Sequence, residues 1–161
     1  MMAPVIRKYL LFALAGTPDV VERLLKDLDA DDPRWDIRPN PDRFTLREVV
    51  AHLADWEPIH LERIVRMLEE EDPTLPDVDE GAVAIENDYA HSEPHGSLEW
   101  LRGGRLELVQ KLETLGDAEW SRSGVRVTIG AVTIETLAAF ILAHDGYHTR
   151  QIAQWLSSAE A

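Results

Sequence analysis

The sequence predicts an all-α protein, a four-helix bundle with a short extended or hairpin segment before the last helix. Four long segments place apolar residues three or four positions apart, the spacing of a helix face that packs against a core. Only residues 121–132 alternate apolar and polar side chains as a strand does. The chain has 161 residues, no internal repeat and no shift in composition, so we expect a single domain over residues 1–161.

The first helix is expected over residues 4–29, and Pro4 suits its first turn. The sequence Gly16-Thr17-Pro18-Asp19 then reads as a stop and restart, with Thr17 as an N-cap. We therefore predict one long rod with a kink or offset near Gly16. Residues 30–43 contain three prolines and several aspartates and are predicted to form a loop.

The second helix is predicted over residues 45–68. Thr45 and Glu48 form the T-x-x-E pattern of a capping box, which marks a helix start. Pro58 lies inside this segment and should bend the helix, because it removes one backbone hydrogen bond.

Residues 69–94 are acidic and contain several prolines, and connections of this length are usually functional or packed on the surface. A short helix is predicted within them, over residues 82–89. The third long helix is expected over residues 97–115, with Ser97 as its N-cap. The pair Gly103-Gly104 costs ~1 kcal/mol per glycine relative to alanine, which indicates a close helix–helix approach or a bend.

The last helix, Thr136–Leu156, carries His144 and His148 four residues apart, so both project from the same face. They continue an apolar stripe that runs from Leu137 to Ile152, which directs both imidazoles into the core. A buried histidine needs partners for its ring nitrogens. Two interpretations are open at this point: a core pair with internal hydrogen bonds, and a site for a divalent metal ion.

His52 on the second helix is a third histidine on an inner face. Four-helix bundles build metal sites from side chains on facing helices. Three imidazole nitrogens would leave at least one position for water, as in catalytic zinc-type sites. We therefore predict a metal site made of His52, His144 and His148. The alternative is that His52 lies at a surface edge and the other two only form internal hydrogen bonds.

The remaining histidines are not expected to join this site. His60 should pack or face solvent, and His91 and His95 lie in the acidic connection. Two tyrosines, Tyr89 and Tyr147, are candidates to line a pocket, although core packing is favoured for Tyr147.

The composition excludes several classes of partner. The chain has 30 acidic and 16 basic residues, a net charge of −14 and no cysteine. This charge argues against sequence-independent nucleic-acid binding and against an anionic membrane surface. No apolar stretch reaches the ~18 residues that span a bilayer, so we expect a cytoplasmic protein. Without cysteine, histidine and carboxylate are the strong metal ligands that remain.

The histidines belong to two longer motifs. The run FTLREVVAHLADWE at residues 44–57 resembles the second-helix signature of the DinB/YfiT-like superfamily, although its first position is phenylalanine where tryptophan is common. The runs GAVTIETL at 130–137 and AHDGYHTRQI at 143–152 are similar to the C-terminal signature of that superfamily. Three further polar residues match motif positions, where we expect a supporting or structural part rather than catalysis: Asp55, Glu57 and Gln151.

The resemblance implies a four-helix bundle with a histidine-rich site for a divalent metal ion, commonly nickel or zinc, and frequent homodimers. The metal ligands of the family fall on His52, His144 and His148. Its characterised branches depend on thiols and include mycothiol-dependent maleylpyruvate isomerase and the bacillithiol transferases.

The leading interpretation is a metal-dependent enzyme with a small-molecule substrate, in which the ion lowers the pKa of a water or a substrate thiol. Because the chain has no cysteine, a thiolate nucleophile would come from a low-molecular-weight thiol cosubstrate, as in a transferase or isomerase. Two alternatives stay open, a non-catalytic stress-related metal-binding bundle and a metal-dependent hydrolase. Residues 69–96 distinguish them, because a site that opens on a pocket favours an enzyme and a sealed site favours a binding protein.

Overall fold

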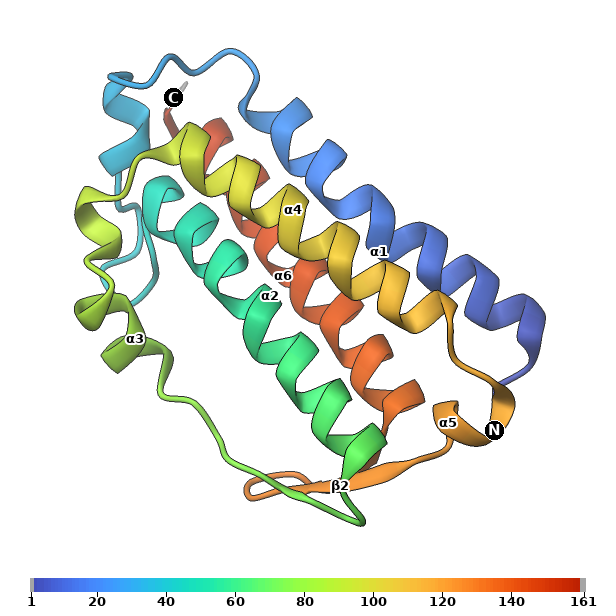
Figure 1. The fold of residues 1–161 in the computed structure, drawn as a ribbon. Helices are drawn as coiled ribbons and strands as arrows, with labels where there is room; N and C mark the ends of the chain where they lie inside the picture. Colours follow the sequence, from blue (N-terminus) through green and yellow to red (C-terminus); the bar gives the residue numbers. More distant parts are fainter. Residues whose placement is uncertain (1, 160–161) are drawn as a thin grey trace.

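A computed structural model of the chain describes residues 2–159. Four long helices pack as a bundle, which confirms the predicted fold class: α1 (Pro4–Leu25), α2 (Leu46–Glu69), α4 (Pro94–Glu113) and α6 (Ile134–Ala159) (Figure 1). The other helices are short and lie in the connections: η1 (Pro33–Asp36), α3 (Glu80–Glu86), η2 (Tyr89–His91) and α5 (Asp117–Trp120). No helix within residues 2–159 has the length and apolar character needed to span a membrane.

Helix α1 runs without a break through residues 16–19, so the predicted stop and restart is wrong. Thr17 is buried inside the helix, and its hydroxyl donates to Asp145 Oδ2 at 2.8 Å instead of capping a helix start. Val21 and Leu25 continue the buried face beyond it. Packing along one continuous rod therefore overrides the local Thr-Pro signal, and the helix ends at Leu25 rather than at residue 29.

Helix α2 begins as predicted. The Thr45 side chain accepts from Glu48 N at 3.3 Å, and the Glu48 carboxylate accepts from Thr45 N at 2.7 Å, which completes the capping box. Arg38 in the preceding loop donates to both oxygens of the same carboxylate, at 2.7 Å each. Pro58 lies within the helix on its exposed side.

Helix α4 begins before the predicted Ser97. Glu93 is the N-cap, because its carboxylate accepts from the backbone N–H groups of His95 and Gly96. The glycine pair inside α4 lies at a close approach to α2, which is one of the two possibilities predicted from the sequence. A Cβ added at Gly104 would lie 2.6 Å from Glu57 Cβ on α2, whereas one added at Gly103 would meet nothing within 4 Å.

The predicted extended segment is a hairpin that leads into α6. Strands β2 (Ser123–Arg126) and β3 (Gly130–Thr133) pair antiparallel, and Gly130 has a φ of +83°, a value that glycine adopts without strain. A two-residue strand, β1 (Thr74–Leu75), pairs parallel with β2 and gives the sheet order β1-β2-β3. The sequence does not predict β1, because two residues are too few to show an alternating pattern.

Two apolar clusters fill the bundle, and each long helix contributes to both. One cluster contains Leu14 and Ile141, and the other contains Leu53 and Ile152. Between its two apolar stretches each helix places a buried polar residue: Thr17 on α1, Glu57 on α2, Arg105 on α4 and Asp145 on α6. The bundle therefore has a polar layer between two apolar ones, and this layer positions the candidate site.

Candidate metal centre

The structure brings together the three histidines predicted from the sequence. His52 from α2 and His144 and His148 from α6 offer ligand atoms that lie within 4.8 Å of one another. The Nε2 atoms of His52 and His144 are 3.0 Å apart, and the His148 ring centroid lies 4.7 Å and 4.6 Å from those of His52 and His144. His52 is 0% exposed, so the alternative that places it at a surface edge is wrong.

Burial keeps these imidazoles neutral. Burial, followed by the charges of His148 and His144, lowers the pKa of His52 to about 2. Burial, with a smaller effect of Arg105, lowers the pKa of His144 to about 4. The pKa of His148 is also lowered to about 4, first by burial and then by His144, against the hydrogen bond to Gln151. The neutral ring is the form of histidine that binds metals.

Gln151 orients His148. The Gln151 side-chain oxygen lies 3.2 Å from His148 Nδ1, and its Nε2 donates to the Phe44 carbonyl at 2.9 Å. Trp155 Nε1 donates to the same carbonyl at 2.9 Å. Because an amide oxygen only accepts, His148 carries its proton on Nδ1 and leaves the Nε2 lone pair free for the site. Gln151 thus has the supporting part expected from its motif position.

The donor set fits a divalent metal ion. Neighbouring ligands that bind at ~2.1 Å are ~3.0 Å apart in an octahedral site and ~3.4 Å apart in a tetrahedral one, so the 3.0 Å between the two Nε2 atoms is near this range. The Nδ1 atoms of His52 and His144 are buried and have no hydrogen-bond partner within residues 2–159. Neither Nδ1 is held as an acceptor within these residues, so each ring can carry its proton there, and an ion between the two Nε2 atoms would replace the hydrogen bond that now joins them. Neutral imidazoles suit ions such as zinc and nickel.

A buried ionic network lies beside the histidines and joins all four helices. Arg105 Nη2 donates to Glu57 Oε1 at 2.6 Å, and Arg105 Nη1 donates to Asp145 Oδ2 at 2.5 Å and to the Leu14 carbonyl at 2.9 Å. Burial raises the pKa of Glu57, against the hydrogen bonds from Arg105. Burial alone would lower the pKa of Arg105, but its bonds to Asp145 and Glu57 outweigh that effect and raise it. Glu57 therefore has a structural part.

The structure places a fourth buried histidine near the site. His60 is 1% exposed, and its ring centroid lies 6.0 Å from that of His144 and 5.7 Å from that of Trp56. Burial lowers its pKa well below the ordinary value. The sequence predicted that His60 either packs in the core or faces solvent, and the structure shows that it packs. His60 lies outside the group of three whose ligand atoms converge.

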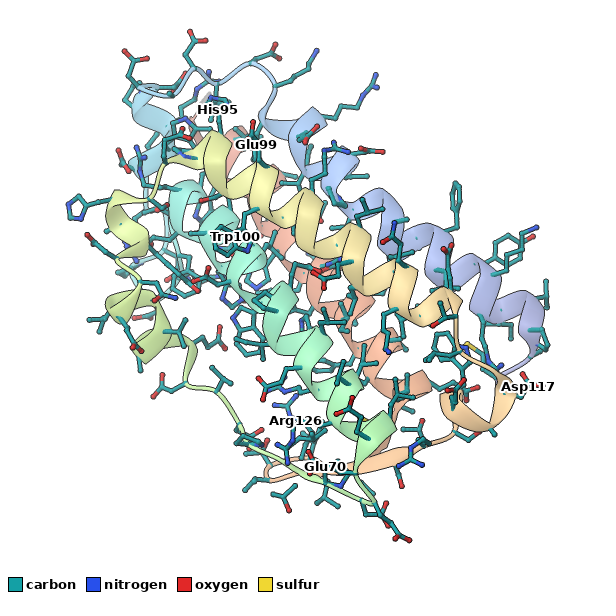
Figure 2. All side chains as sticks on the ribbon, viewed as in Figure 1. Glu70, His95, Glu99, Trp100, Asp117 and Arg126 are labelled. Atoms are coloured by element: carbon teal, nitrogen blue, oxygen red, sulfur yellow. The ribbon has the colours of Figure 1, made fainter. Side chains whose placement is uncertain are left out.

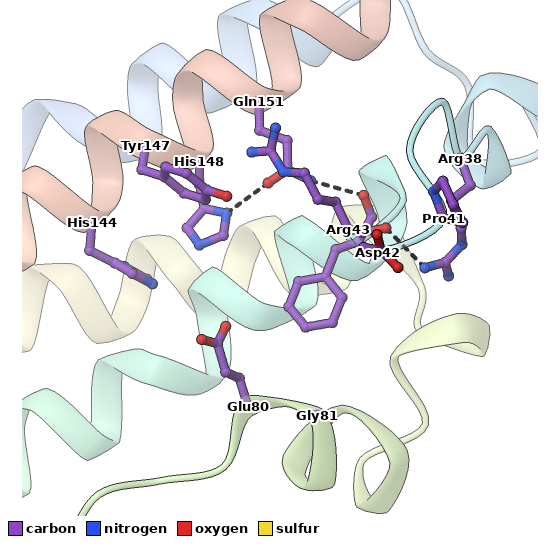
Figure 3. A pocket seen from close by; sticks show the side chains of 11 residues that line it. Arg38, Pro41, Asp42, Arg43, Glu80, Gly81, His144, Tyr147, His148 and Gln151 are labelled. Carbon is purple, nitrogen blue, oxygen red and sulfur yellow. Dashed lines mark hydrogen bonds between the residues drawn. The ribbon is translucent and has the colours of Figure 1, made fainter. Parts of the chain in front are cut away.

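Through His144 and His148 the cluster opens on a pocket of about 580 Å³ between α6, the loop before α2 and the start of α3. Figure 3 shows His144 and His148 on α6 at one side and Glu80 pointing up toward them from α3. The sequence did not predict the four charged residues of the lining: Arg38, Asp42, Arg43 and Glu80. Tyr147 is 56% exposed and lines the pocket, so the expectation of core packing is wrong.

The other predicted polar residues lie away from the pocket. Asp55 accepts from Asn87 Nδ2 at 2.6 Å on an exposed surface. His91 is exposed and bonds to Asp88 at 2.7 Å. His95 lies at the start of α4, near Glu99 (Figure 2), where it lines a different surface hollow with residues of α1. Tyr89 is buried.

The fold and the site define a four-helix-bundle protein with a cluster of three histidines that opens on a pocket, in which His52 and His148 are buried and His144 is half-buried. The chain belongs to the DinB superfamily, whose profile matches residues 13–152. It is also similar to the solved structure of YfiT from Bacillus subtilis, with a TM-score of 0.92 and 23% sequence identity over 99% of this chain and 91% of that one. That protein is described as "a probable metal-dependent hydrolase with an unusual four-helix bundle topology". No curated protein matches the chain.

Proposed function

We propose that the protein is a divalent-metal-dependent enzyme that acts on a small molecule. The observation that carries this proposal is that the three-histidine cluster opens on the pocket of about 580 Å³. This volume lies within the ~300–1,000 Å³ of ordinary small-molecule sites. A sealed site would have favoured a binding protein, and Gly81 and Glu80 of α3 line the pocket instead of closing it.

His52, His144 and His148 would hold the ion, and zinc or nickel suits their three neutral nitrogens. When bound, such an ion supplies Lewis acidity and lowers the pKa of a water or a thiol in contact with it. The chain supplies position: Gln151 orients His148, and Arg105 fixes α6 through Asp145. Phe44 and Tyr147 give the pocket an aromatic wall.

The reaction that we propose first is group transfer or isomerisation with a low-molecular-weight thiol as cosubstrate. The chain has no cysteine, so a sulfur nucleophile has to enter with a second molecule. The pocket has room for a small thiol and a small electrophile side by side. Hydrolysis is the second candidate, and the description of YfiT as a metal-dependent hydrolase favours it.

The first experiment is metal analysis of protein purified without a His tag or a chelating column. Metal-loaded protein is then assayed with a panel of electrophiles, with and without several biological thiols. Turnover that requires the thiol and disappears in His148→Ala supports thiol transfer. Turnover that ignores the thiol assigns hydrolysis, and a metal-loaded protein that turns over nothing in the panel favours the non-catalytic alternative. The homodimer stays a prediction, which the hydrodynamic mass of the purified chain tests.

A further inference from the structure

Arg43 is the cation of the pocket that has no acidic partner among residues 2–159. It lies in the loop before α2, and no carboxylate within residues 2–159 forms an ion pair with it. Its Nε is buried and has no hydrogen-bond partner in the described part of the chain. Arg38, the other arginine of the pocket, is already engaged, because it donates to the Glu48 carboxylate and to the Arg43 carbonyl.

The position of Arg43 is fixed by α6. Its guanidinium carbon lies 4.8 Å from the ring centroid of Tyr147 and 4.9 Å from that of Trp155. The carbonyl of the next residue, Phe44, accepts hydrogen bonds from Gln151 and Trp155. Two aromatic rings and a pinned backbone therefore hold the guanidinium in one orientation, which reduces the entropy lost when it binds a ligand.

Arg43 is linked to the metal centre through Tyr147. The Tyr147 ring, whose centroid lies 4.8 Å from the Arg43 guanidinium carbon, has its centroid 5.0 Å from that of His148. Gln151, which orients His148, lines the pocket together with Arg43 (Figure 3). A group bound to this guanidinium would therefore lie in the same pocket as the histidines.

We propose that Arg43 binds a carboxylate of the substrate, so that the enzyme acts on small organic acids. A guanidinium matches a carboxylate with two parallel N–H···O bonds. The pocket lining also contains Asp42 and Glu80, whose negative charges oppose the charge of Arg43. The pocket therefore suits a ligand with one negative charge better than a phosphate dianion. This inference names the substrate class of the proposed enzyme and rests on that proposed function.

A neighbouring surface hollow is the other place where a carboxylate could bind Arg43. Arg43 also lines this hollow, together with Arg150 and Trp155. Arg150 is exposed there and does not line the pocket of the histidines. It therefore supplies a matched control, because its removal deletes the same charge from the hollow alone.

The test uses the full chain after metal removal with EDTA, so that its result does not depend on the proposed metal chemistry. Benzoate is titrated into the protein and followed by NMR shifts, with uncharged benzamide as the comparison. We expect benzoate to bind roughly tenfold or more tightly than benzamide, and Arg43→Met to lose roughly tenfold or more of the benzoate affinity. The benzoate affinity of Arg43→Lys should lie between those of the wild type and Arg43→Met, because lysine keeps the charge and lacks the planar guanidinium.

Arg150→Met should bind benzoate as the wild type does. Equal benzoate affinity in wild type, Arg43→Lys and Arg43→Met would overturn the proposal. A loss in Arg150→Met as large as that in Arg43→Met would also overturn it, and so would tighter binding of inorganic phosphate than of benzoate. If Arg43→Met fails to fold, Arg43→Lys and the benzamide comparison decide. A wild type that binds benzoate but takes up neither zinc nor nickel refutes the proposed function and leaves the carboxylate site standing.

Discussion

Arg105 on α4 donates to Asp145 on α6 at 2.5 Å, and Asp145 directly follows His144. Successive side chains of a helix diverge by about 100°, so a contact that fixes one of them also fixes the direction of the next. The arginine therefore sets the rotation of α6 about its axis while it stays out of the histidine cluster. The polar layer of the bundle and the candidate metal centre form a single structural unit.

Arg105→Ala should greatly lower the urea concentration at which the protein unfolds. The change leaves the carboxylates of Glu57 and Asp145 buried without their cation, and breaking a buried pair in this way typically costs ~3–5 kcal/mol. Arg102→Ala is the matched control, because its ion pairs to Asp19 and Glu22 lie on the surface, where such pairs contribute about 0–1 kcal/mol. Urea unfolding at pH 7 measures both. Equal losses in the two variants would contradict the structural role of the network.

Much of the fold and the three histidines could be predicted because their signals are local. The capping box of Thr45 and the four-residue spacing of His144 and His148 can be recognised within single turns of helix. His52 could be added because it lies on the inner face of α2. Each of these signals requires knowledge of one element only.

The rest of the site depends on how the elements meet. Arg43 and Glu80 come from loops whose course no periodic pattern fixes, so their approach to the histidines was not predictable. Arginine is usually exposed, and the burial of Arg105, which is 1% exposed, could not be predicted because its partners Glu57 and Asp145 are distant in sequence. Thr17 was misread for a similar reason, since its partner Asp145 lies on another helix.

Gln151→Ala should weaken metal binding without removing a ligand. The glutamine holds His148 in the tautomer that frees Nε2, and residues with this role typically contribute 10–100-fold in metal affinity. Gln154→Ala is the control, because Gln154 is exposed on the same helix. Competition with a chromophoric chelator at pH 7.5 measures the zinc affinity of both variants. A Gln151→Ala protein that binds zinc as tightly as Gln154→Ala would disprove the orienting role.

The metal-free protein should lose stability on acidification between about pH 6.5 and pH 4. The pKa values of His144 and His148 are lowered to about 4 in the folded chain, whereas an unfolded histidine titrates near ~6.5. The unfolded state therefore binds more protons in this window, and the free energy of unfolding falls as the pH falls. Each such histidine contributes up to ~1.4 kcal/mol per pH unit.

Urea unfolding in EDTA at pH 7.5 and pH 5.5 checks this dependence. His52→Phe should show a smaller loss, because it removes one histidine whose folded pKa is about 2. The raised pKa of Glu57 acts in the opposite direction and is common to both proteins, so the difference between them isolates the histidine. A metal-free wild type as stable at pH 5.5 as at pH 7.5 would be incompatible with neutral buried histidines.

The two adjacent glycines of α4 should respond in opposite ways to alanine. Alanine favours a helix over glycine by ~1 kcal/mol, so Gly103→Ala, where a new Cβ meets nothing within 4 Å, should stabilise the protein by up to that amount. At Gly104 the new Cβ would lie 2.6 Å from Glu57 Cβ, an atom too close to the backbone to move aside alone. Helices α2 and α4 would have to separate, and overpacking of this kind typically costs ~1–3 kcal/mol.

Because Glu57 belongs to the network that fixes α6, Gly104→Ala should also weaken metal binding, and Gly103→Ala should not. Thermal unfolding with and without zinc measures both effects, and a stabilised Gly104→Ala protein with unchanged zinc affinity would show that this close approach is not required.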